Sequence, residues 1–508
     1  MSELGSVTPA FVRDQEVQAR PAPVRTTGVV ALMRARLFNS PTNIILTLLG
    51  VLLLYLIVVP LVRFLLVDAV WTGSSRTDCL AETLQRDVGA CWPFVQAKFS
   101  QFVYGFYPQP ERWRVDLTFA IAALLLPPLL IPRAPAKTLN AGLFFIAFPV
   151  VAFFLLHGGG INGFAVTWIT DLLSGLIGSL SEAGSKLASG GAFAMIIGKP
   201  VLGLATALTW LIAPLVWLRD WIAATGQPVW TDLGLTALIA VALVVALSGG
   251  LRNGARPLIV VLGLFVGIAV VIALLRLDRG GLPVVGTRQW GGLLITLVVS
   301  VTGIVGSMPI GIALALGRRS SIPLIRVFCV AFIEFWRGVP LITVLFFATY
   351  MLPLFLPGNF TVDGLVRVLI GIALFAGAYN AEVIRGGLNA IPRGQAEAAS
   401  ALGLSYWKTT GLIVLPQALR HVIPGLVNIP GLVNSFIALF KDTSLVSIVA
   451  LFDLLGQLRA AFADPNWSTP TTLFTGFAFT GLIYFVFCFG MSRYSLFVEH
   501  RLNAHRRT

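Results

Sequence analysis

Charged side chains are scarce in this sequence of 508 residues, because Asp, Glu, Lys and Arg together make up only 11% of it. A soluble globular domain carries about 25% of such residues, so this chain cannot cover a compact surface in water. The hydrophobic fraction of 57% and the mean hydropathy of +0.87 agree. The scarcity excludes a soluble enzyme, a disordered tail protein and a nucleic-acid binder, and it leaves a membrane protein. In such a protein the net charge of +14 comes from basic residues beside apolar stretches, where they set orientation.

Cysteine is also rare. Four cysteines exclude a disulfide scaffold, and no CxxC or Cys/His cluster has the spacing of a zinc site, so we expect no metal. Cys329 and Cys488 lie inside apolar runs. Cys79 and Cys91 share one polar loop, and in an oxidising compartment we expect them to form a bridge. The alternative is two free thiols, because sequence alone does not give the geometry.

Motifs for catalysis are missing as well. No GxxxxGK(S/T) occurs, so the chain cannot cradle the phosphates of ATP, and energy must come from a partner. The four histidines are scattered, and no Ser/His/Asp set has a motif context. We therefore expect a chain that is not an enzyme and has no cofactor of its own.

Long apolar runs are abundant, and a spanning helix needs about 20 mostly apolar residues. The segment 43–157 predicts three spans with an external loop at 68–115. Arg34 and Arg36 precede the first span, which places the tail 1–42 in the cytoplasm. The three runs are 43–67, 116–132 and 141–157.

The segment 158–280 is bounded by glycine clusters and contains further apolar runs. Its basic loop at 250–256 is expected inside, and an even number of spans keeps the sidedness of the rest consistent. We predict four spans, at 163–181, 191–217, 232–249 and 257–275. The alternative is an external amphipathic helix at 163–189 and a hairpin within 191–217, where two prolines interrupt the run.

The segment 281–495 predicts a core of five spans, with a mixed polar stretch at 385–414 and a tail at 496–508 that both face the cytoplasm. The fold class is therefore an all-α polytopic membrane protein with additional transmembrane helices before its core. The five runs are 290–317, 325–352, 363–384, 415–440 and 472–492.

Residues 391–416, named the elbow from this point on, predict two short helices joined at a glycine. Ala396, Ala399 and Gly403 stand at i, i+3 and i+7 and so form one small-residue face. We expect this face to let another protein approach closely, and Glu397 to supply one fixed charge.

The ends of the two elbow helices also have signals. Pro392 suits the first turn of a helix, and Gly403 suits a left-handed terminator. Ser405 can cap a second helix at 406–414. We expect Pro416 to end that helix and to open the next span.

The spacing of the elbow resembles the signature of ABC importer permeases: Glu-Ala-Ala, three residues, Gly, nine residues, Ile-x-Leu-Pro. The resemblance implies a type I ABC importer permease core, in which the elbow docks into a groove on a cytoplasmic ATPase. The residues that carry it are Glu397, Ala398, Ala399, Gly403, Ile413, Leu415 and Pro416.

Other stretches between 282 and 495 narrow the resemblance to the polar amino-acid, histidine/glutamine-type subfamily. One of them departs from the subfamily's pattern, since Val339 stands where Thr is usual. The stretches are 290–297, 332–341, 378–387 and 440–445.

The Cys-containing loop and residues 102–114 resemble the longer permeases of general L-amino acid (glutamate/glutamine/aspartate/asparagine) importers. In those proteins the third span runs almost directly into the stretch that begins at Gly281 in this sequence. The segment 158–280 is therefore interpreted as an insertion with spans of its own.

Ionisable groups inside spans are costly and mark functional hypotheses. Glu334 and Arg337 stand at i and i+3, the spacing of an ion pair, which either fixes packing or contacts substrate. Glu382 and Arg385 repeat that spacing. An amino-acid substrate carries an ammonium and a carboxylate, so its pathway needs a partner for each, although each candidate could instead be structural. The pathway candidates are Tyr379, Asn380, Glu382, Asn434, Lys441, Asp442 and Ser444.

The resemblance implies a permease that moves polar L-amino acids across a bacterial inner membrane, with both termini in the cytoplasm. Its implied partners are an ABC ATPase that holds ATP and Mg²⁺, a second homologous permease subunit in a heterodimer, a periplasmic amino-acid-binding protein and membrane lipid, but no nucleic acid. One alternative is an ion-gradient-driven secondary transporter, a class that often has inverted repeats, which we do not find between the halves. Another is a scaffold subunit in which 158–280 is the functional part.

Overall fold

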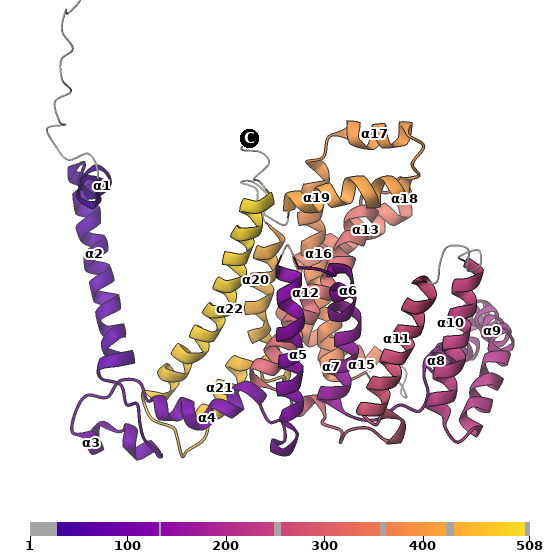
Figure 1. Ribbon diagram of the computed structural model, residues 1–508, viewed down its shortest axis with the longest axis horizontal. Coiled ribbons are helices and arrows are strands. Elements are labelled where there is room, and N and C mark those ends of the chain that lie inside the picture. The colour runs from indigo at the N-terminus through magenta and orange to yellow at the C-terminus, as the bar shows by residue number, and fades with distance from the viewer. Residues whose placement is uncertain (1–27, 132–133, 248–255, 356–361, 423–430, 503–508) are drawn as a thin grey trace, which may run out of the picture. The chain divides into compact units, whose positions relative to one another are not determined.

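The computed structural model describes residues 28–131, 134–247, 256–355, 362–422 and 431–502, and their regular structure is helical (Figure 1). Parts of the predicted cytoplasmic tails lie outside these residues, as does the predicted basic loop at 250–256 apart from Arg256, which begins a helix. The chain divides into two compact units. Unit 1 comprises the residues up to Pro93 together with Thr469–Thr475, and unit 2 comprises Phe94–Ser468 and the residues after 475.

Unit 1 contains the long apolar helix that the first run predicts. Ser40 begins this helix by accepting a hydrogen bond from the backbone N–H of Asn43 at 3.2 Å. Side chains all along the helix are exposed in the described chain, as expected where lipid is the neighbour. The elements of unit 1 are α1 (Val29–Arg36), α2 (Pro41–Val62) with a π-helical turn at Arg63–Val67, α3 (Ala81–Leu84) and the first residues of α4 (Trp92–Tyr104) and α22 (Thr472–Leu502).

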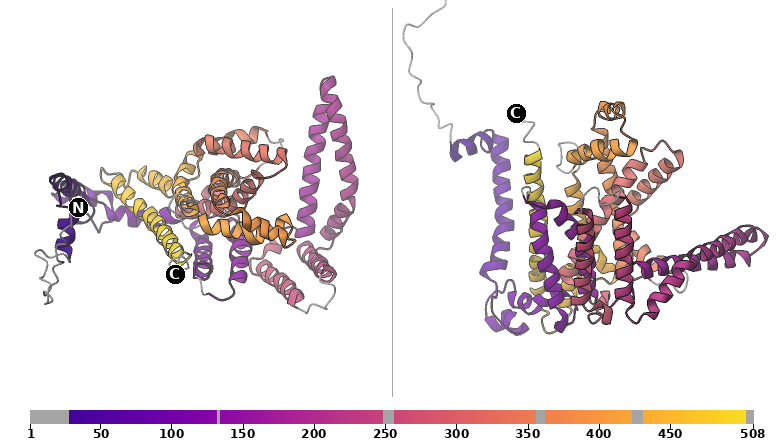
Figure 2. Two further views of the ribbon diagram at one scale, coloured as in Figure 1. Left: turned by 90° about the horizontal axis from the view of Figure 1, so that it is seen from above. Right: turned by 45° about the vertical axis from the view of Figure 1, so that its right-hand side comes forward.

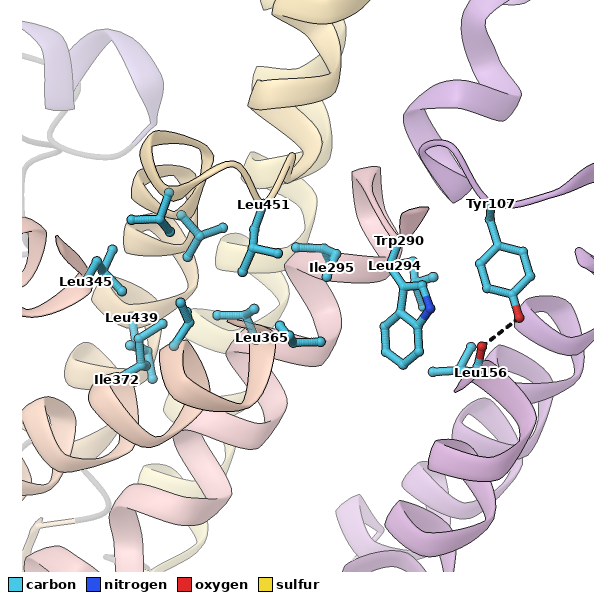
Figure 3. Packing of buried hydrophobic residues seen from close by; sticks show 14 of the residues in the cluster. Tyr107, Leu156, Trp290, Leu294, Ile295, Leu345, Leu365, Ile372, Leu439 and Leu451 are labelled. Atoms are coloured by element: carbon cyan, nitrogen blue, oxygen red, sulfur yellow. Dashed lines mark hydrogen bonds between the residues drawn. The ribbon is translucent and has the colours of Figure 1, made fainter. Parts of the chain in front are cut away.

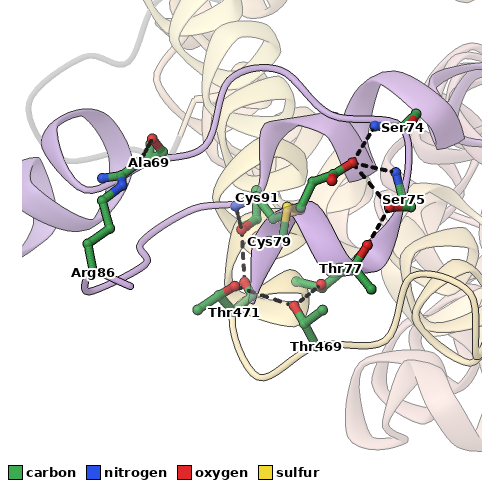
Figure 4. The surroundings of a disulfide bond; sticks show 12 residues. Ala69, Ser74, Ser75, Thr77, Cys79, Arg86, Cys91, Thr469 and Thr471 are labelled. Carbon is green, nitrogen blue, oxygen red and sulfur yellow. Dashed lines mark hydrogen bonds between the residues drawn. A yellow bond between two sulfur atoms is a disulfide. The ribbon is translucent and has the colours of Figure 1, made fainter. Parts of the chain in front are cut away.

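A disulfide joins Cys79 and Cys91 in the loop after α2 (Figure 4). Both cysteines are buried. The backbone N–H of Cys91 donates to Thr475 Oγ1 at 2.9 Å, so the bridged loop is attached to the start of α22. Of the two alternatives for these cysteines, the structure contains the bridge rather than two free thiols.

The turn before Cys79 is held by Asp78. Its carboxylate accepts the backbone N–H groups of Ser74 at 2.8 Å and Ser75 at 3.0 Å. These two hydrogen bonds favour the ionised form and hold the pKa of Asp78 below its ordinary value. The loop is thus fixed on both sides of the disulfide.

Unit 2 contains the helices that precede and form the predicted core (Figure 1). π-helical turns at Leu143–Ala147 and Phe347–Met351 join α6 to α7 and α14 to α15. Its helices after α4 are α5 (Trp113–Leu130), α6 (Lys137–Gly142), α7 (Phe148–His157), α8 (Ala165–Ala188), α9 (Ala192–Ala224), α10 (Pro228–Leu247), α11 (Arg256–Leu274), α12 (Gly292–Gly317), α13 (Pro323–Gly338), α14 (Leu341–Phe346), α15 (Leu352–Phe355), α16 (Gly364–Asn389), α17 (Arg393–Ala401), α18 (Tyr406–Thr409), α19 (Leu415–Val422), α20 (Leu432–Asp442), α21 (Leu454–Phe462) and most of α22.

Helices α12 and α16 form the centre of unit 2 and pack along one another. Glycines allow the close approach: a Cβ at Gly311 would lie 2.9 Å from the Cβ of Asn380, and one at Gly377 would lie 2.6 Å from Ile310. Two apolar clusters surround this pair, one towards each end of the helices. The centre of the core therefore depends on small residues at the α12–α16 contact.

One of these clusters joins the preceding helices to the core (Figure 3). Trp290 and Leu294 at the start of α12 belong to the same buried cluster as Tyr107 and Leu156. The Tyr107 hydroxyl donates to the backbone oxygen of Leu156 at 2.8 Å, which satisfies this buried polar atom. The part of the chain before 158 that belongs to unit 2 is thus packed against the core.

Nine helical segments of the described chain are long and apolar enough to cross a membrane, or ten if a bent pair counts as one span. The prediction of an all-α polytopic membrane protein is confirmed. The segments are Pro41–Val67, Gln109–Leu130, Lys137–His157, Ala194–Ala224, Pro228–Ala246, Gly292–Gly317, Gly364–Asn389, Leu432–Val449 and Thr472–Arg501.

Two predicted core spans differ from the structure. The run at 325–352 consists of two helical parts bent by 104°. Its break lies at Val339, which precedes Pro340 and is extended, as the residue before a proline prefers. The run predicted at 415–440 includes residues 423–430, which lie outside the described residues. On either side of them the structure has helix α19, which ends at Val422, and a candidate span at Leu432–Val449 that extends beyond the predicted end.

The segment 158–280 departs most from its prediction of four spans. Helices α8 and α9 pack side by side as one antiparallel hairpin, and α10 and α11 form a second pair. No span is found at 163–181, because only residues 172–181 separate Asp171 from Glu182 in α8. Helix α9 runs without a break through Pro200 and Pro214, so the alternative hairpin within 191–217 is not found either.

Candidate functional site

The first half of the elbow is a short helix that ends at a glycine. Helix α17 begins directly after Pro392, one residue later than predicted. Gly403 has a φ of +77°. Its N–H donates to the Ser400 oxygen at 2.9 Å, and the N–H of Leu404 donates to the Ala399 oxygen at 3.1 Å. These two bonds are those of a Schellman motif, so the predicted left-handed terminator is confirmed.

The second half of the elbow is longer than predicted. Helix α18 follows Ser405 and passes through a π-helical turn at Thr410–Val414 into α19. The prediction that Pro416 ends this helix is wrong. Pro416 has no N–H to donate, and its ring needs space in the preceding turn. Both are accommodated because the π-helical turn shifts the hydrogen-bond register just before Pro416, where the N–H of Leu415 donates to the Thr410 oxygen.

The small-residue face of α17 is turned inwards in part. Ala399 is buried and Ala396 is half-buried, while α17 packs on α18 and on residues 410–414. The expectation that this face meets another protein is therefore wrong for Ala399, whose small side chain serves the fit between the two elbow helices, whereas Gly403 is exposed and stays available to a partner. Glu397 and Ala398 lie on the outer face and are exposed.

Large apolar side chains lie on the outside of the elbow, and the sequence analysis missed them. Leu402 is 81% exposed and Trp407 is 75% exposed, while Tyr406 and Leu412 are also exposed. An exposed patch of this kind marks a surface that meets another protein or a membrane. The available signal was two adjacent aromatic residues, three and four positions after the glycine of a polar stretch.

A charged cluster lies at the elbow end of the core. Glu382 on α16 accepts from Arg385 at 2.8 Å and from Arg318, at the end of α12, at 2.7 Å. Arg318 also reaches Glu334 on α13 at 3.1 Å, and Arg337 lies 4.0 Å from Glu382. The predicted Glu334–Arg337 pair is therefore wrong, because both side chains turn to partners on other helices. Three arginines and two glutamates thus connect α12, α13 and α16.

Two pathway candidates, Tyr379 and Asn380, stand three and two residues before Glu382 on α16. The Tyr379 ring lies 5.8 Å from the guanidinium of Arg337, a cation–π contact. Asn380 is 1% exposed, and its Nδ2 donates to Ser307 Oγ on α12 at 3.0 Å. The Oδ1 of Asn380 has no hydrogen-bond partner among the described residues. An uncompensated acceptor is thus buried beside the charged cluster.

The remaining pathway candidates are not gathered at this place. Asn434 lies near the start of α20, where the neighbouring Leu432 packs in the elbow-side cluster. Lys441 and Asp442 end α20, and Ser444 follows them, at the other end of that helix. The structure therefore brings Tyr379, Asn380 and Glu382 together and separates the last three candidates from them. The described residues hold no group of three or more metal-ligating side chains.

Two known proteins match nearly the whole chain, and a family model matches its last part. A family model described as binding-protein-dependent transport system inner membrane component matches residues 307–504. The inner membrane amino-acid ABC transporter permease protein YhdY of Escherichia coli is 35% identical, with 96% of each chain covered. The glutamate/glutamine/aspartate/asparagine transport system permease protein BztC of Rhodobacter capsulatus is 38% identical, with 98% of this chain and 99% of that one covered.

A solved structure is also similar. It is a crystal structure of an amino acid ABC transporter with histidines, 28% identical, and the match covers 41% of this chain and 92% of that chain with a TM-score of 0.35.

Proposed function

We propose a function from one established premise: this chain belongs to the family of binding-protein-dependent transport system inner membrane components, among the amino-acid ABC transporter permeases. A member is a multi-pass inner-membrane subunit and not an enzyme, because a separate subunit hydrolyses ATP. The chain therefore supplies the membrane path of an importer. The observation that carries the detailed proposal is the elbow, two helices joined at Gly403 with an exposed apolar patch at the end of the core spans.

The elbow faces the cytoplasm in this proposal. Arg318 and Arg319 follow α12 directly, and Arg319 donates to the Leu388 oxygen near the start of the elbow. Lys408 adds a further positive charge within the elbow. Basic residues collect on the cytoplasmic side of membrane proteins, so both termini are assigned to that side. The disulfide loop is assigned to the oxidising side, which suits its bridge.

The exposed elbow patch is the docking surface for an ABC ATPase. Its apolar anchors, Leu402, Tyr406 and Trp407, fit a groove better than a flat surface, and aromatic anchors dominate binding energy at interfaces. ATP and Mg²⁺ are held by that ATPase. A second, homologous permease subunit and a periplasmic amino-acid-binding protein complete the assembly.

The substrates are polar L-amino acids. The charged cluster has a carboxylate for a substrate ammonium and arginines for a substrate carboxylate. Three arginines against two glutamates leave one positive charge in excess, which favours substrates with a second carboxylate or an amide oxygen. Because the cluster connects α12, α13 and α16, a substrate that replaces one of its ion pairs can shift the balance between two rigid-body states.

Uptake by the reconstituted importer tests this function. The chain, its ATPase and its partner permease are placed in proteoliposomes with the binding protein outside. We expect uptake of labelled glutamate or glutamine that requires ATP inside and is unaffected by ionophores. Uptake without ATP in an imposed ion gradient would instead support a secondary transporter, and transport by a chain lacking 163–275 would exclude the scaffold alternative.

A further inference from the structure

The hairpin of α8 and α9 carries a large exposed apolar surface. On α9, Trp210 is 83% exposed, and Trp217 and Trp221 are also exposed at i+7 and i+11, so the three indoles share one face. Contact between the two helices relies on small residues, since a Cβ at Gly184 would lie 3.0 Å from the backbone N of Leu202. The described chain covers only one side of α9, and its other sides need an apolar neighbour.

Helix α8 differs from α9 because it is amphipathic. Trp168, Leu172 and Leu176 stand at i, i+4 and i+8 and form an exposed apolar stripe. Asp171 and Glu182 lie on another stripe, together with Gly175, Gly178, Ser185 and Ser189. A helix with one polar and one apolar stripe is typical of a segment that lies in a membrane interface.

The base of the hairpin is fixed on the side of unit 2 opposite the elbow. The buried carboxylate of Asp232 on α10 accepts the backbone N–H groups of Phe164 at 2.7 Å and Thr167 at 2.9 Å, so it caps α8 from another helix. The N–H of Ile161 donates to Leu277, in the stretch that leads to the start of α12. Because the elbow follows α16, at the far end of α12, the hairpin begins at the opposite membrane surface.

The hairpin runs crosswise to the long core helices of unit 2: it is seen lengthwise from above in the left view of Figure 2, and it extends sideways from the upright helices in the right view. Its lengths agree with that direction. Helix α9 has 33 residues, which at about 1.5 Å each makes a rod of roughly 50 Å, much longer than the ~30 Å hydrocarbon core of a bilayer. In α8 the uncharged stretch between Asp171 and Glu182 covers only about 15 Å.

We propose that the α8–α9 hairpin does not cross the membrane but lies along its extracytoplasmic surface, with phospholipid as its partner. Helix α9 and the apolar stripe of α8 are immersed in the outer leaflet, while the polar stripe of α8 faces water. The indoles of Trp210, Trp217 and Trp221 lie at the level of the headgroups, where tryptophan is enriched. The tip at Ser189 stays on the side opposite the elbow.

Cysteine labelling tests the position of the tip. The background carries Cys329→Ala and Cys488→Ser, and each test variant adds a single cysteine. Ser189→Cys reports the tip of the hairpin. Gln109→Cys is the standard for the side opposite the elbow, and Ser321→Cys is the standard for the elbow side. Gln109 is near Gly105, which bridges to Trp290 before α12, and Ser321 follows α12. We expect an impermeant maleimide to label S189C in intact cells as it labels Q109C. Protection of S189C in intact cells, as for S321C, overturns the proposal.

Spin-label depth tests the orientation independently of the tip. Spin labels are attached to single cysteines at three exposed positions of α9, by the substitutions Ile197→Cys, Leu204→Cys and Leu211→Cys. These positions are seven residues apart on one face of the helix, about 21 Å from first to last. In the full chain reconstituted in phosphatidylethanolamine and phosphatidylglycerol vesicles, we expect the same shallow depth and high oxygen accessibility at all three. A depth that changes steadily from 197 to 211 indicates a crossing helix, and immobilised labels with low oxygen accessibility indicate a protein partner; either result overturns the proposal.

Discussion

Gly403 is the residue on which the shape of the elbow depends. Its φ of +77° suits glycine, because a side chain in that region costs roughly 1–2 kcal/mol. No atom of the described residues lies within 4 Å of the Cβ that a substitution would add. We therefore expect Gly403→Val to act through backbone strain alone, reorienting the exposed patch and lowering both ATPase co-purification and ATP-driven uptake by at least tenfold.

A matched glycine in the same elbow provides the control. Gly394 in α17 has open space at its Cβ and an ordinary helical backbone, so Gly394→Ala should leave uptake unchanged. Gly403→Asn should be intermediate, since asparagine tolerates the left-handed region better than valine. Wild-type uptake and ATPase co-purification in Gly403→Val would contradict the role of the elbow.

Glu382 is the centre of the charged cluster, and the sequence predicted only one of its ion pairs. Spacing on one helix predicts its pair with Arg385, but its bonds to Arg318 come from α12 and follow only from packing. The side chain of Glu382 is 16% exposed, against 56% for Glu334. We expect Glu382→Gln to lower stability by roughly 1–3 kcal/mol, as for the loss of hydrogen bonds to a charged group.

Thermal unfolding in detergent, followed by the reactivity of buried Cys329, measures this difference. Glu334→Gln is the matched control, because an exposed ion pair contributes about 0–1 kcal/mol. An equal fall in the unfolding midpoint of both variants would show that Glu382 does not hold the three helices together. Uptake should fall further in Glu382→Gln than stability alone explains, since the carboxylate is also the proposed partner of the substrate ammonium.

At the scale of elements, Asp232 determines where α8 begins. Its carboxylate accepts the N–H groups of Phe164, Val166 and Thr167, which have no such acceptor within α8 itself. We expect Asp232→Ala to destabilise the hairpin by about 2 kcal/mol, at the upper end of the cost of a lost helix cap. Faster cleavage by an added protease at residues 158–164 reports the loss. Asp220→Ala, which removes only an exposed pair with Arg219, should cleave at the wild-type rate.

The elements that sequence could predict are those whose signals are local. The first run and the turn at Gly403 follow from apolar length and from the backbone that glycine allows. The course of α8 and α9 could not be predicted, because hydropathy reports burial in apolar surroundings and not the direction of a helix. The cap from Asp232 connects residues more than sixty positions apart, and a lone aspartate in an apolar run does not indicate its partner.

The candidate site was predictable to the same degree. Gly403 and the other elbow residues could be identified from their spacing, whereas the spacing did not show which side chains of α17 are buried. Ala399 carries a small side chain, which suits contact with a partner protein and equally suits contact with the neighbouring helix. Only the packing of α17 on residues 410–414 decides between the two. The exposed Leu402 and Trp407 then become the surface that remains for a partner.

At the scale of the whole molecule, the division into two units predicts that the disulfide acts locally. Cys79 and Cys91 are twelve residues apart, and closing a loop of this size contributes about 3 kcal/mol. The bridge and its attachment to Thr475 both belong to unit 1, whereas Cys329 lies in a cluster of unit 2. In the double variant Cys79→Ser and Cys91→Ser, we expect cleavage between 72 and 88 by an external protease to rise at least tenfold.

The same variant should leave unit 2 unchanged. A thiol-reactive dye that reports exposure of Cys329 on heating should give the wild-type midpoint, because the lost bridge belongs to unit 1 and Cys329 belongs to a cluster of unit 2. Cys488→Ser, which removes a cysteine outside the disulfide, should change neither readout. If the unfolding midpoint reported by Cys329 falls together with the rise in cleavage, the two units unfold as one and the disulfide stabilises the whole membrane domain. Unchanged cleavage would instead mean that hydrogen bonds such as those of Asp78 hold the loop without the bridge.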